Sequence, residues 1–277
     1  MSLQKRTLGK TGVEVTILGL GGEGVLRTFG REDEAYRLIN RALDLGINYF
    51  ESARAYAGSE AYYGLALRER RNDIFLTSKS HARDRQGALD HLTETLRNMK
   101  TDHIDLWQVH DVRTDEDIEE IFGTNGAIEA FAFAKEKGMT RFIGVTGHHD
   151  PIVLSKCIGL FDFDTVLMPV NPAEPSYKSF IGNVLPVARE RRMGVIGMKV
   201  YFRGLAARLG QIAPLSQFYR FALSHDIDTA VIGCDTPTHV EENVMFAGTF
   251  LPLDPQEKEF LESSLRSYAR RLMYYKE

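Results

Sequence analysis

The sequence predicts a single eight-fold β/α barrel, an α/β fold with an N-terminal β-hairpin and a C-terminal helix. Short apolar runs alternate with longer amphipathic runs along the 277 residues, and eight such pairs can be counted. Strands that alternate with helices form right-handed parallel crossovers, and eight such units close a barrel. No change of composition marks a second domain, so we expect residues 1–277 to form one domain.

The hairpin comes first. Two β-type runs between Lys5 and Leu20 are separated by Lys10-Thr11-Gly12, a turn signal, and the second run leads into the first barrel strand. We expect barrel strands at residues 17–20, 48–52, 74–78, 104–109, 142–146, 165–170, 194–200 and 229–232.

Helices are expected where apolar residues recur at three-to-four spacing, at residues 32–45, 59–70, 86–99, 126–138, 150–160, 177–192, 213–225 and 237–248. The segment 254–277 predicts a final helix on the barrel exterior, because its apolar residues also have helical spacing. These residues are Phe260, Leu261, Leu265, Tyr268 and Leu272. An open doubly wound sheet is the alternative, but no Gly-x-Gly-x-x-Gly turn opens a helix.

Composition and charge narrow the range of possible functions. A net charge of -4 and a pI near 6.1 argue against nucleic acid as the partner and favour a small molecule. Cys157 and Cys234 are the only cysteines, and no Cys/His cluster has zinc-ligand spacing, so we expect no metal and a reducing cytoplasm. No window approaches the roughly 20 apolar residues of a membrane span.

The candidate catalytic residues lie at the ends of consecutive predicted strands, which face the active site of a β/α barrel. The second strand ends at Glu51, with Tyr56 five residues later; the third ends at Lys79 and the fourth at His110. Three neighbouring strands therefore supply a carboxylate, a phenol, an ammonium and an imidazole. Each residue alone has an ordinary structural interpretation as a surface or rim side chain, whereas their joint placement indicates a site.

These groups suit the reduction of a carbonyl. Hydride addition places negative charge on the carbonyl oxygen, so a proton donor is needed there, and Tyr56 is the natural one. We expect the Lys79 ammonium to lower the pKa of Tyr56 and Glu51 to hold Lys79 in place. His110 would orient the carbonyl through a hydrogen bond. The hydride must come from a cofactor, because no side chain supplies one.

This order of residues resembles the catalytic tetrad of the aldo-keto reductase family. Gly58-Ser59-Glu60 matches the stretch after the tyrosine, and Val231-Ile232-Gly233 with the run from His239 to Asn243 resembles its dinucleotide-binding segment. The resemblance spans nearly the whole chain. It implies NADP(H), with NAD(H) possible, and an aldehyde or ketone substrate. Glu51 departs from the family, which usually has aspartate there.

The resemblance also implies a set of cofactor-binding residues: Gly22, Thr146, Gly147, His148, Leu167, Met198, Lys199, Gly233, Cys234, Asp235, His239, Glu242 and Asn243. Several depart from the family. Thr146-Gly147 replaces Ser-Asn, with His148 able to supply the lost polar contact. Leu167 replaces a glutamine and Met198 a ring-stacking tyrosine, although both could simply fill the barrel.

The residues that select the 2'-phosphate of NADP also differ, since Gly233 and His239 replace a lysine and an arginine. The preference for NADP over NAD is therefore left open. Lys199, Arg203 and Arg208 could compensate by reaching the pyrophosphate or the 2'-phosphate, or could form a solvated basic cluster.

Two other functions stay open. Lys79 could form a Schiff base in an aldolase, or the barrel could be a non-catalytic, cofactor-binding regulatory subunit. The substrate pocket is expected to be partly apolar, with five residues at the barrel mouth: Glu23, Leu26, Phe29, Trp107 and Phe202.

Overall fold

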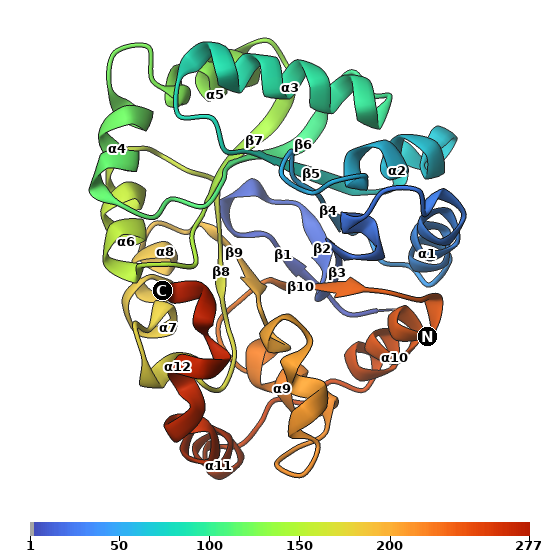
Figure 1. Ribbon diagram of the computed structural model, residues 1–277, viewed down its shortest axis with the longest axis vertical. Coiled ribbons are helices and arrows are strands. Elements are labelled where there is room, and N and C mark those ends of the chain that lie inside the picture. The colour runs from blue at the N-terminus through green and yellow to red at the C-terminus, as the bar shows by residue number, and fades with distance from the viewer. Residues whose placement is uncertain (1–2) are drawn as a thin grey trace.

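The computed structural model describes residues 3–277, which form a closed barrel of eight parallel strands surrounded by helices (Figure 1). The order of the strands around the barrel follows the chain, and the last strand pairs with the first. The strands are β3 (Leu18–Gly24), β4 (Tyr49–Glu51), β5 (Phe75–Ser80), β6 (Ile104–Val109), β7 (Thr140–Thr146), β8 (Thr165–Pro169), β9 (Gly194–Met198) and β10 (Thr229–Cys234). The predicted fold class is confirmed, and the predicted strands differ only at their ends.

The predicted hairpin closes the bottom of the barrel. Strands β1 (Lys5–Thr7) and β2 (Glu14–Thr16) are antiparallel, and Gly12 in their connection has a φ of 71°, which favours glycine. Leu8 and Val15 of this hairpin are fully buried in the cluster that fills the barrel interior. The two cavities described below lie at the opposite end, where the strands finish.

Alternation along the strands decides which side chains reach that end. Tyr49, Phe75 and Leu106 point into the barrel and pack together, whereas their neighbours Phe50 and Trp107 belong to the layer between strands and helices. Because side chains alternate, residues two positions further along each strand also face inward, one layer closer to the open end. This periodicity places the strand-end side chains described below around one opening.

The helices cover the outside of the barrel (Figure 1). Several begin where the sequence provides a cap: Asp84 accepts a hydrogen bond from the N–H of Gly87, and Thr114 with Asp117 forms a capping box. The helices are α1 (Glu32–Asp44), α2 (Ser59–Ala66), α3 (Arg85–Met99), α4 (Asp115–Phe122), α5 (Ala127–Glu136), α6 (Pro151–Leu160), α7 (Phe180–Asn183), α8 (Leu185–Glu190), α9 (Leu215–Leu223), α10 (Pro237–Gly248), α11 (Pro255–Leu265) and α12 (Ala269–Leu272).

Three predictions about the helices are wrong in detail. Helix α4 was not predicted, since it is short and acidic and buries only Ile118 and Ile121. The helix expected at residues 177–192 is divided into α7 and α8, because Pro186 cannot donate the hydrogen bond that a continuous helix needs. Helix α2 ends at Ala66 and a 3-10 segment follows it.

The final segment also differs from the single exterior helix that was expected. It contains α11, a 3-10 turn and α12, and Leu261, Leu265 and Leu272 pack in a second core beside α9, while Phe260 and Tyr268 are exposed. The chain then turns toward the barrel opening and ends beside α7 and α8 (Figure 1). Within residues 3–277, no helix combines the length and apolar character that a membrane crossing requires.

Candidate active site

The structure brings the four predicted catalytic residues together at the open end of the barrel. Lys79, at the end of β5, forms a buried ion pair with Glu51 at the end of β4. Its Nζ also donates to the carbonyl oxygen of Ser52 at 2.8 Å and to the hydroxyl of Tyr56 at 3.4 Å. The imidazole of His110 lies edge-to-face with the Tyr56 ring, with 5.9 Å between ring centroids. The expected tetrad therefore exists as one contact network.

Gly22 allows this network to close. Its N–H donates to Oε2 of Glu51 at 2.9 Å, which leaves the other carboxylate oxygen for Lys79. A Cβ at Gly22 would lie 2.7 Å from the carbonyl oxygen of Glu51 and 2.8 Å from Cδ2 of Tyr56. Only glycine leaves room for the acid and the phenol here, so Gly22 supports the catalytic side of the site.

The pKa of Tyr56 moves in the direction opposite to the expected one. Burial raises it above the usual value of 10, and the nearby Glu23 carboxylate raises it further. The prediction of a lowered pKa for Tyr56 is wrong, because desolvation by burial outweighs the neighbouring positive charges. Burial also holds the pKa of Lys79 well below its usual value. Tyr56 is thus protonated at neutral pH.

His110 is neutral at neutral pH. Burial holds its pKa well below the usual 6.5, and the charge of Lys79 acts in the same direction. The backbone N–H of His110 donates to the carbonyl oxygen of Ser80. The ring atom Nδ1, in contrast, is buried without a hydrogen-bond partner. A buried ring nitrogen without a partner beside Tyr56 suits a hydrogen bond to a ligand.

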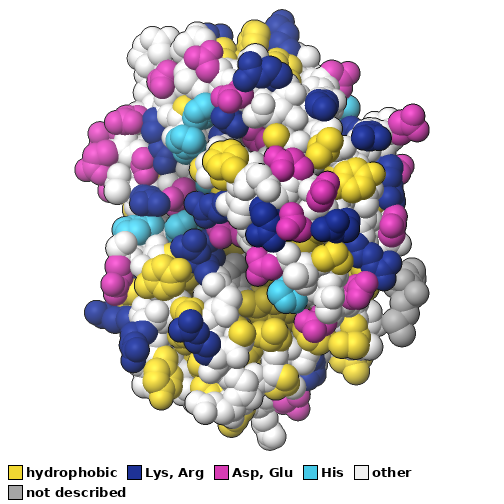
Figure 2. Space-filling model, turned by 45° about the vertical axis from the view of Figure 1, so that its right-hand side comes forward, with side chains coloured by type: hydrophobic (Ala, Val, Ile, Leu, Met, Phe, Trp, Pro, Cys, Tyr) yellow, Lys and Arg dark blue, Asp and Glu magenta, His cyan; other side chains and the backbone are white. Residues whose placement is uncertain are grey.

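The first cavity lies directly over this network and has a volume of about 440 Å³. Charged and imidazole side chains dominate its wall, and Figure 2 shows basic and acidic groups intermingled around a hollow in this face. The pocket is nevertheless partly apolar, as expected, because apolar side chains and the aliphatic parts of the charged ones also line it. Its lining residues include Glu23, Arg27, Tyr56, Lys79, His81, Arg83, His110, Asp111, Arg113, Asp117, His148, Lys199 and Arg203, with Ala55, Leu167 and Met198 as the apolar exceptions.

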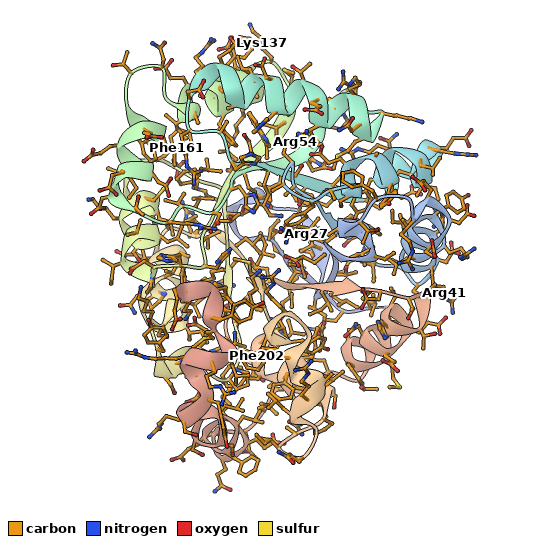
Figure 3. The ribbon with its side chains drawn as sticks, in the orientation of Figure 1. Arg27, Arg41, Arg54, Lys137, Phe161 and Phe202 are labelled. Atoms are coloured by element: carbon orange, nitrogen blue, oxygen red, sulfur yellow. The ribbon has the colours of Figure 1, made fainter. Side chains whose placement is uncertain are left out.

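Of the five residues expected at the mouth, only Glu23 lines this cavity. Trp107 points outward and stacks on Phe131 at 3.8 Å, as the alternation along β6 requires. Leu26 is fully buried, and Phe29 is 80% exposed. Phe202 is buried against Phe218 on the α9 side of the barrel (Figure 3).

A second cavity, of about 310 Å³, continues from the first between the ends of β3, β9 and β10. Five residues line both cavities, namely Glu23, Tyr56, Met198, Lys199 and Arg203. The second cavity reaches Gly233 and Asp235 at the end of β10, and Tyr274 from the C-terminal segment forms part of its wall. Because they share these residues, the two cavities form one cleft beside the tetrad.

Seven of the predicted cofactor residues line one or both of these cavities. Thr146, His148, Leu167, Met198 and Lys199 line the first cavity, while Gly233 and Asp235, with Met198 and Lys199 again, line the second. The hydroxyl of Thr146 accepts the N–H of Asp111 at 2.8 Å, and Nε2 of His148 lies 3.2 Å from Asp111.

The remaining predicted cofactor residues line neither cavity: Gly22, Gly147, Cys234, His239, Glu242 and Asn243. Asn243 is buried, and its side chain is engaged within the protein. Its Oδ1 accepts the hydroxyl of Tyr201 at 2.7 Å, and its Nδ2 donates to the carbonyl oxygen of His239 at 2.7 Å. Cys234 is buried beside it, whereas His239 and Glu242 are exposed on α10.

Sequence reasoning missed several residues of the cleft, notably Arg27, Asp111 and Tyr274. The guanidinium of Arg27 lies 5.0 Å from the centre of the Tyr56 ring and projects over the middle of the barrel (Figure 3). Its position four residues after Glu23, with opposite charge, was a signal for a local ion pair. Asp111 follows His110 with a φ of 58°, a conformation that the sequence does not reveal.

Comparison with known proteins identifies the family to which this barrel belongs. Residues 17–211 match the model of the aldo/keto reductase family, so the chain belongs to that family and is an oxidoreductase. It is 26% identical to the L-galactose dehydrogenase of Arabidopsis thaliana over 87% of each chain.

Solved structures are similar over the whole barrel. An aldo-keto reductase of Bacillus halodurans, in its holo form, superposes with a TM-score of 0.80 at 25% identity, covering 94% of this chain and 96% of that one. An aldo-keto reductase of Klebsiella pneumoniae, solved with NADPH, has a TM-score of 0.77 at 19% identity and covers 96% of each chain, a likeness of fold.

Proposed function

We propose that this enzyme reduces an aldehyde or ketone to an alcohol with a nicotinamide dinucleotide, using Tyr56 as the proton donor. The observation that carries the proposal is the network of Glu51, Lys79, Tyr56 and His110 at the floor of a cleft. When bound, the reduced nicotinamide supplies a hydride to the carbonyl carbon. The residues of this chain bind and orient the substrate and provide the proton.

The proton step follows from the contacts of Tyr56. An alkoxide is a stronger base than a phenolate, so the Tyr56 hydroxyl can donate its proton to the oxygen of the reduced substrate even with its raised pKa. The Lys79 ammonium, 3.4 Å from the hydroxyl, stabilises the phenolate as it forms. Neutral His110 donates or accepts a hydrogen bond at the same oxygen and orients the carbonyl.

The cleft fits a dinucleotide in its middle part. Lys199 and Arg203 place two cations where the cavities join, and cations are the groups that bind a pyrophosphate. Gly204 lines the second cavity, and a Cβ there would point into open space, so the backbone is accessible to a ligand. Thr146 and His148 would bind the carboxamide end, and Met198 would lie against the nicotinamide ring.

The charges at the far end of the cleft are expected to select only weakly between NADP(H) and NAD(H). The sequence has no lysine or arginine from Thr229 to Gly248, the stretch that contains β10 and α10. Asp235 lies at the end of the second cavity and would repel a 2'-phosphate. NADP(H) remains the proposed cofactor by relationship to the family, and the local charges support NAD(H) as a second one.

The contacts of Lys79 disfavour a Schiff-base mechanism. Its Nζ is surrounded by Glu51, the Ser52 carbonyl and Tyr56, and the side chain is 1% exposed. The centre of the Tyr56 ring lies 4.5 Å from Nζ and restricts the approach of a carbonyl compound to the amine. The intact network likewise favours catalysis over a purely regulatory role for the barrel.

The test is a fluorescence titration with NADPH and with NADH, followed by turnover of a panel of aldehydes by the wild type and by Tyr56→Phe. We expect binding of at least one dinucleotide by both proteins, and a rate for Tyr56→Phe lower by about 10²- to 10⁴-fold. Turnover by Tyr56→Phe at the wild-type rate would exclude Tyr56 as the proton donor. No binding of either dinucleotide would exclude the proposed reaction.

A further inference from the structure

The charges that line the first cavity are unevenly paired. Arg83 binds Asp117 at 2.8 Å and Arg113 binds Asp111 at 2.6 Å, while the Lys79 charge is compensated by Glu51. These pairs leave three cations of the wall, which are Arg27, Lys199 and Arg203. They share a single carboxylate, that of Glu23.

Glu23 lies among these three cations at the junction of the two cavities. Its Oε1 is 3.0 Å from the guanidinium of Arg27 and 3.8 Å from Nζ of Lys199, and its Oε2 is 3.8 Å from the guanidinium of Arg203. The cluster therefore joins three parts of the chain. Strand β3 carries Glu23, the following turn carries Arg27, and the segment after β9 carries Lys199 and Arg203.

The local backbone indicates that this cluster is held in place by the fold. Lys199 and Arg203 have φ values of 59° and 55°, in the left-handed region that side chains other than glycine rarely adopt. Such conformations concentrate at functional sites, where surrounding contacts maintain them. Gly233 lies opposite Glu23, and a Cβ there would approach Cβ of Glu23 to 2.9 Å.

We propose that Glu23 is an internal counter-ion, which occupies the binding position of a diphosphate group and is exchanged for that group when the ligand binds. The proposal rests on the proposed function, since a dinucleotide supplies the diphosphate. The two negative charges of a diphosphate compensate more of the charge of the three cations than the single carboxylate of Glu23 does. The carboxylate keeps the cations together and lowers the affinity for anions, because the ligand must compete with it.

The substitution Glu23→Gln tests the proposal, with Glu34→Gln as the matched control. Glu34 forms an exposed ion pair with Arg31 on α1 and lines neither cavity, so its substitution removes the same charge from the same part of the chain. Binding of inorganic pyrophosphate, ADP, NADH and NADPH is measured by calorimetry, with adenosine as the uncharged probe. Circular dichroism checks that each variant is folded.

We expect Glu23→Gln to bind pyrophosphate, ADP and both dinucleotides about five- to ten-fold more tightly, with adenosine unchanged and Glu34→Gln like the wild type. Arg203→Gln should weaken the same ligands. Unchanged or weaker binding of these ligands by Glu23→Gln would overturn the proposal. A gain for NADPH alone would assign the cluster to the 2'-phosphate and would also overturn it.

The outcome for the proposed function is separate. If neither the wild type nor Glu23→Gln binds a dinucleotide but Glu23→Gln binds pyrophosphate more tightly than the wild type does, the counter-ion stands and the proposed reaction fails. If the wild type binds and turns over but Glu23→Gln gains nothing, the reaction stands and the counter-ion fails. If Glu23→Gln lowers only the KM of a carboxylated aldehyde relative to its methyl ester, the cluster serves the substrate, and the diphosphate proposal is wrong.

Discussion

The two sides of the cleft are built differently. The proposed catalytic side takes Glu51, Lys79 and His110 from the ends of β4 to β6, where the strand alternation dictates their direction. The proposed cofactor side depends on the segment after β9, where Lys199, Phe202 and Arg203 have positive φ values. The first side is therefore set by regular structure and the second by loop conformation, and substitutions should affect them differently.

The largest effect is expected for Lys79→Met, on the catalytic side. The substitution leaves the buried Glu51 carboxylate without its partner, which should destabilise the fold by about 3–5 kcal/mol. It also removes the charge that stabilises the Tyr56 phenolate, so kcat should fall at least about 10²-fold. Denaturant unfolding and steady-state kinetics measure the two effects.

The double variant Glu51→Gln/Lys79→Met is the control for that prediction. It removes both buried charges, so we expect most of the stability to return while kcat stays low. Recovery of activity together with stability would show that Lys79 acts only through the fold.

A smaller effect is expected for Gly22→Ala. The new Cβ would come within 2.8 Å of Cδ2 of Tyr56 and would displace the ring, so kcat should fall about 10- to 100-fold. Gly159→Ala in α6 is the control, because a Cβ there meets nothing within 4 Å. Dinucleotide affinity should change much less than kcat, and an equal loss of both would contradict the separation of the two sides.

On the cofactor side, Asn243→Ala should cost about 1–2 kcal/mol of stability and leave kcat nearly unchanged. Its amide connects Tyr201 to the carbonyl of His239, so the substitution leaves a partly buried hydroxyl without its acceptor. Thermal unfolding with and without a saturating dinucleotide measures the loss of stability. If the loss appears only in dinucleotide affinity, Asn243 contacts the cofactor as the resemblance implies.

The same division explains what the sequence could predict. The spacing of apolar runs was sufficient for the barrel, and strand ends were sufficient for Glu51, Lys79 and His110, because parallel strands end at one rim. The pKa of Tyr56 was predicted in the wrong direction, since sequence shows the neighbouring lysine but not the burial of both groups.

The cofactor side was less predictable. Asn243 has the expected position on α10, but its amide faces Tyr201, a contact between segments 42 residues apart. The cation cluster depends on left-handed residues in the β9 segment, and no sequence pattern specifies those. Helix α4 was not predicted, because two buried isoleucines are too few to give a periodic pattern of apolar residues.

The smallest expected effect couples the two sides through Tyr56. Lys79 contacts its hydroxyl and His110 its ring, and the charges that act on its pKa are Glu23, Arg27, Asp111 and Arg203. Among them, Glu23 raises the pKa of Tyr56 and Arg27 lowers it. In the oxidative direction Tyr56 must accept a proton, so the rate increases as pH rises through this pKa.

Glu23→Gln should therefore move the rising limb of the pH profile for alcohol oxidation to lower pH, and Arg27→Gln should move it to higher pH. Each displacement should be about 0.5–1 pH unit, because both charges are partly exposed to solvent. Initial rates at saturating dinucleotide, from pH 7 upward, separate this effect from changes in affinity. If the rising limb moves in the same direction in both variants, the pair acts by holding the loop in place, and its charges do not change the pKa of Tyr56.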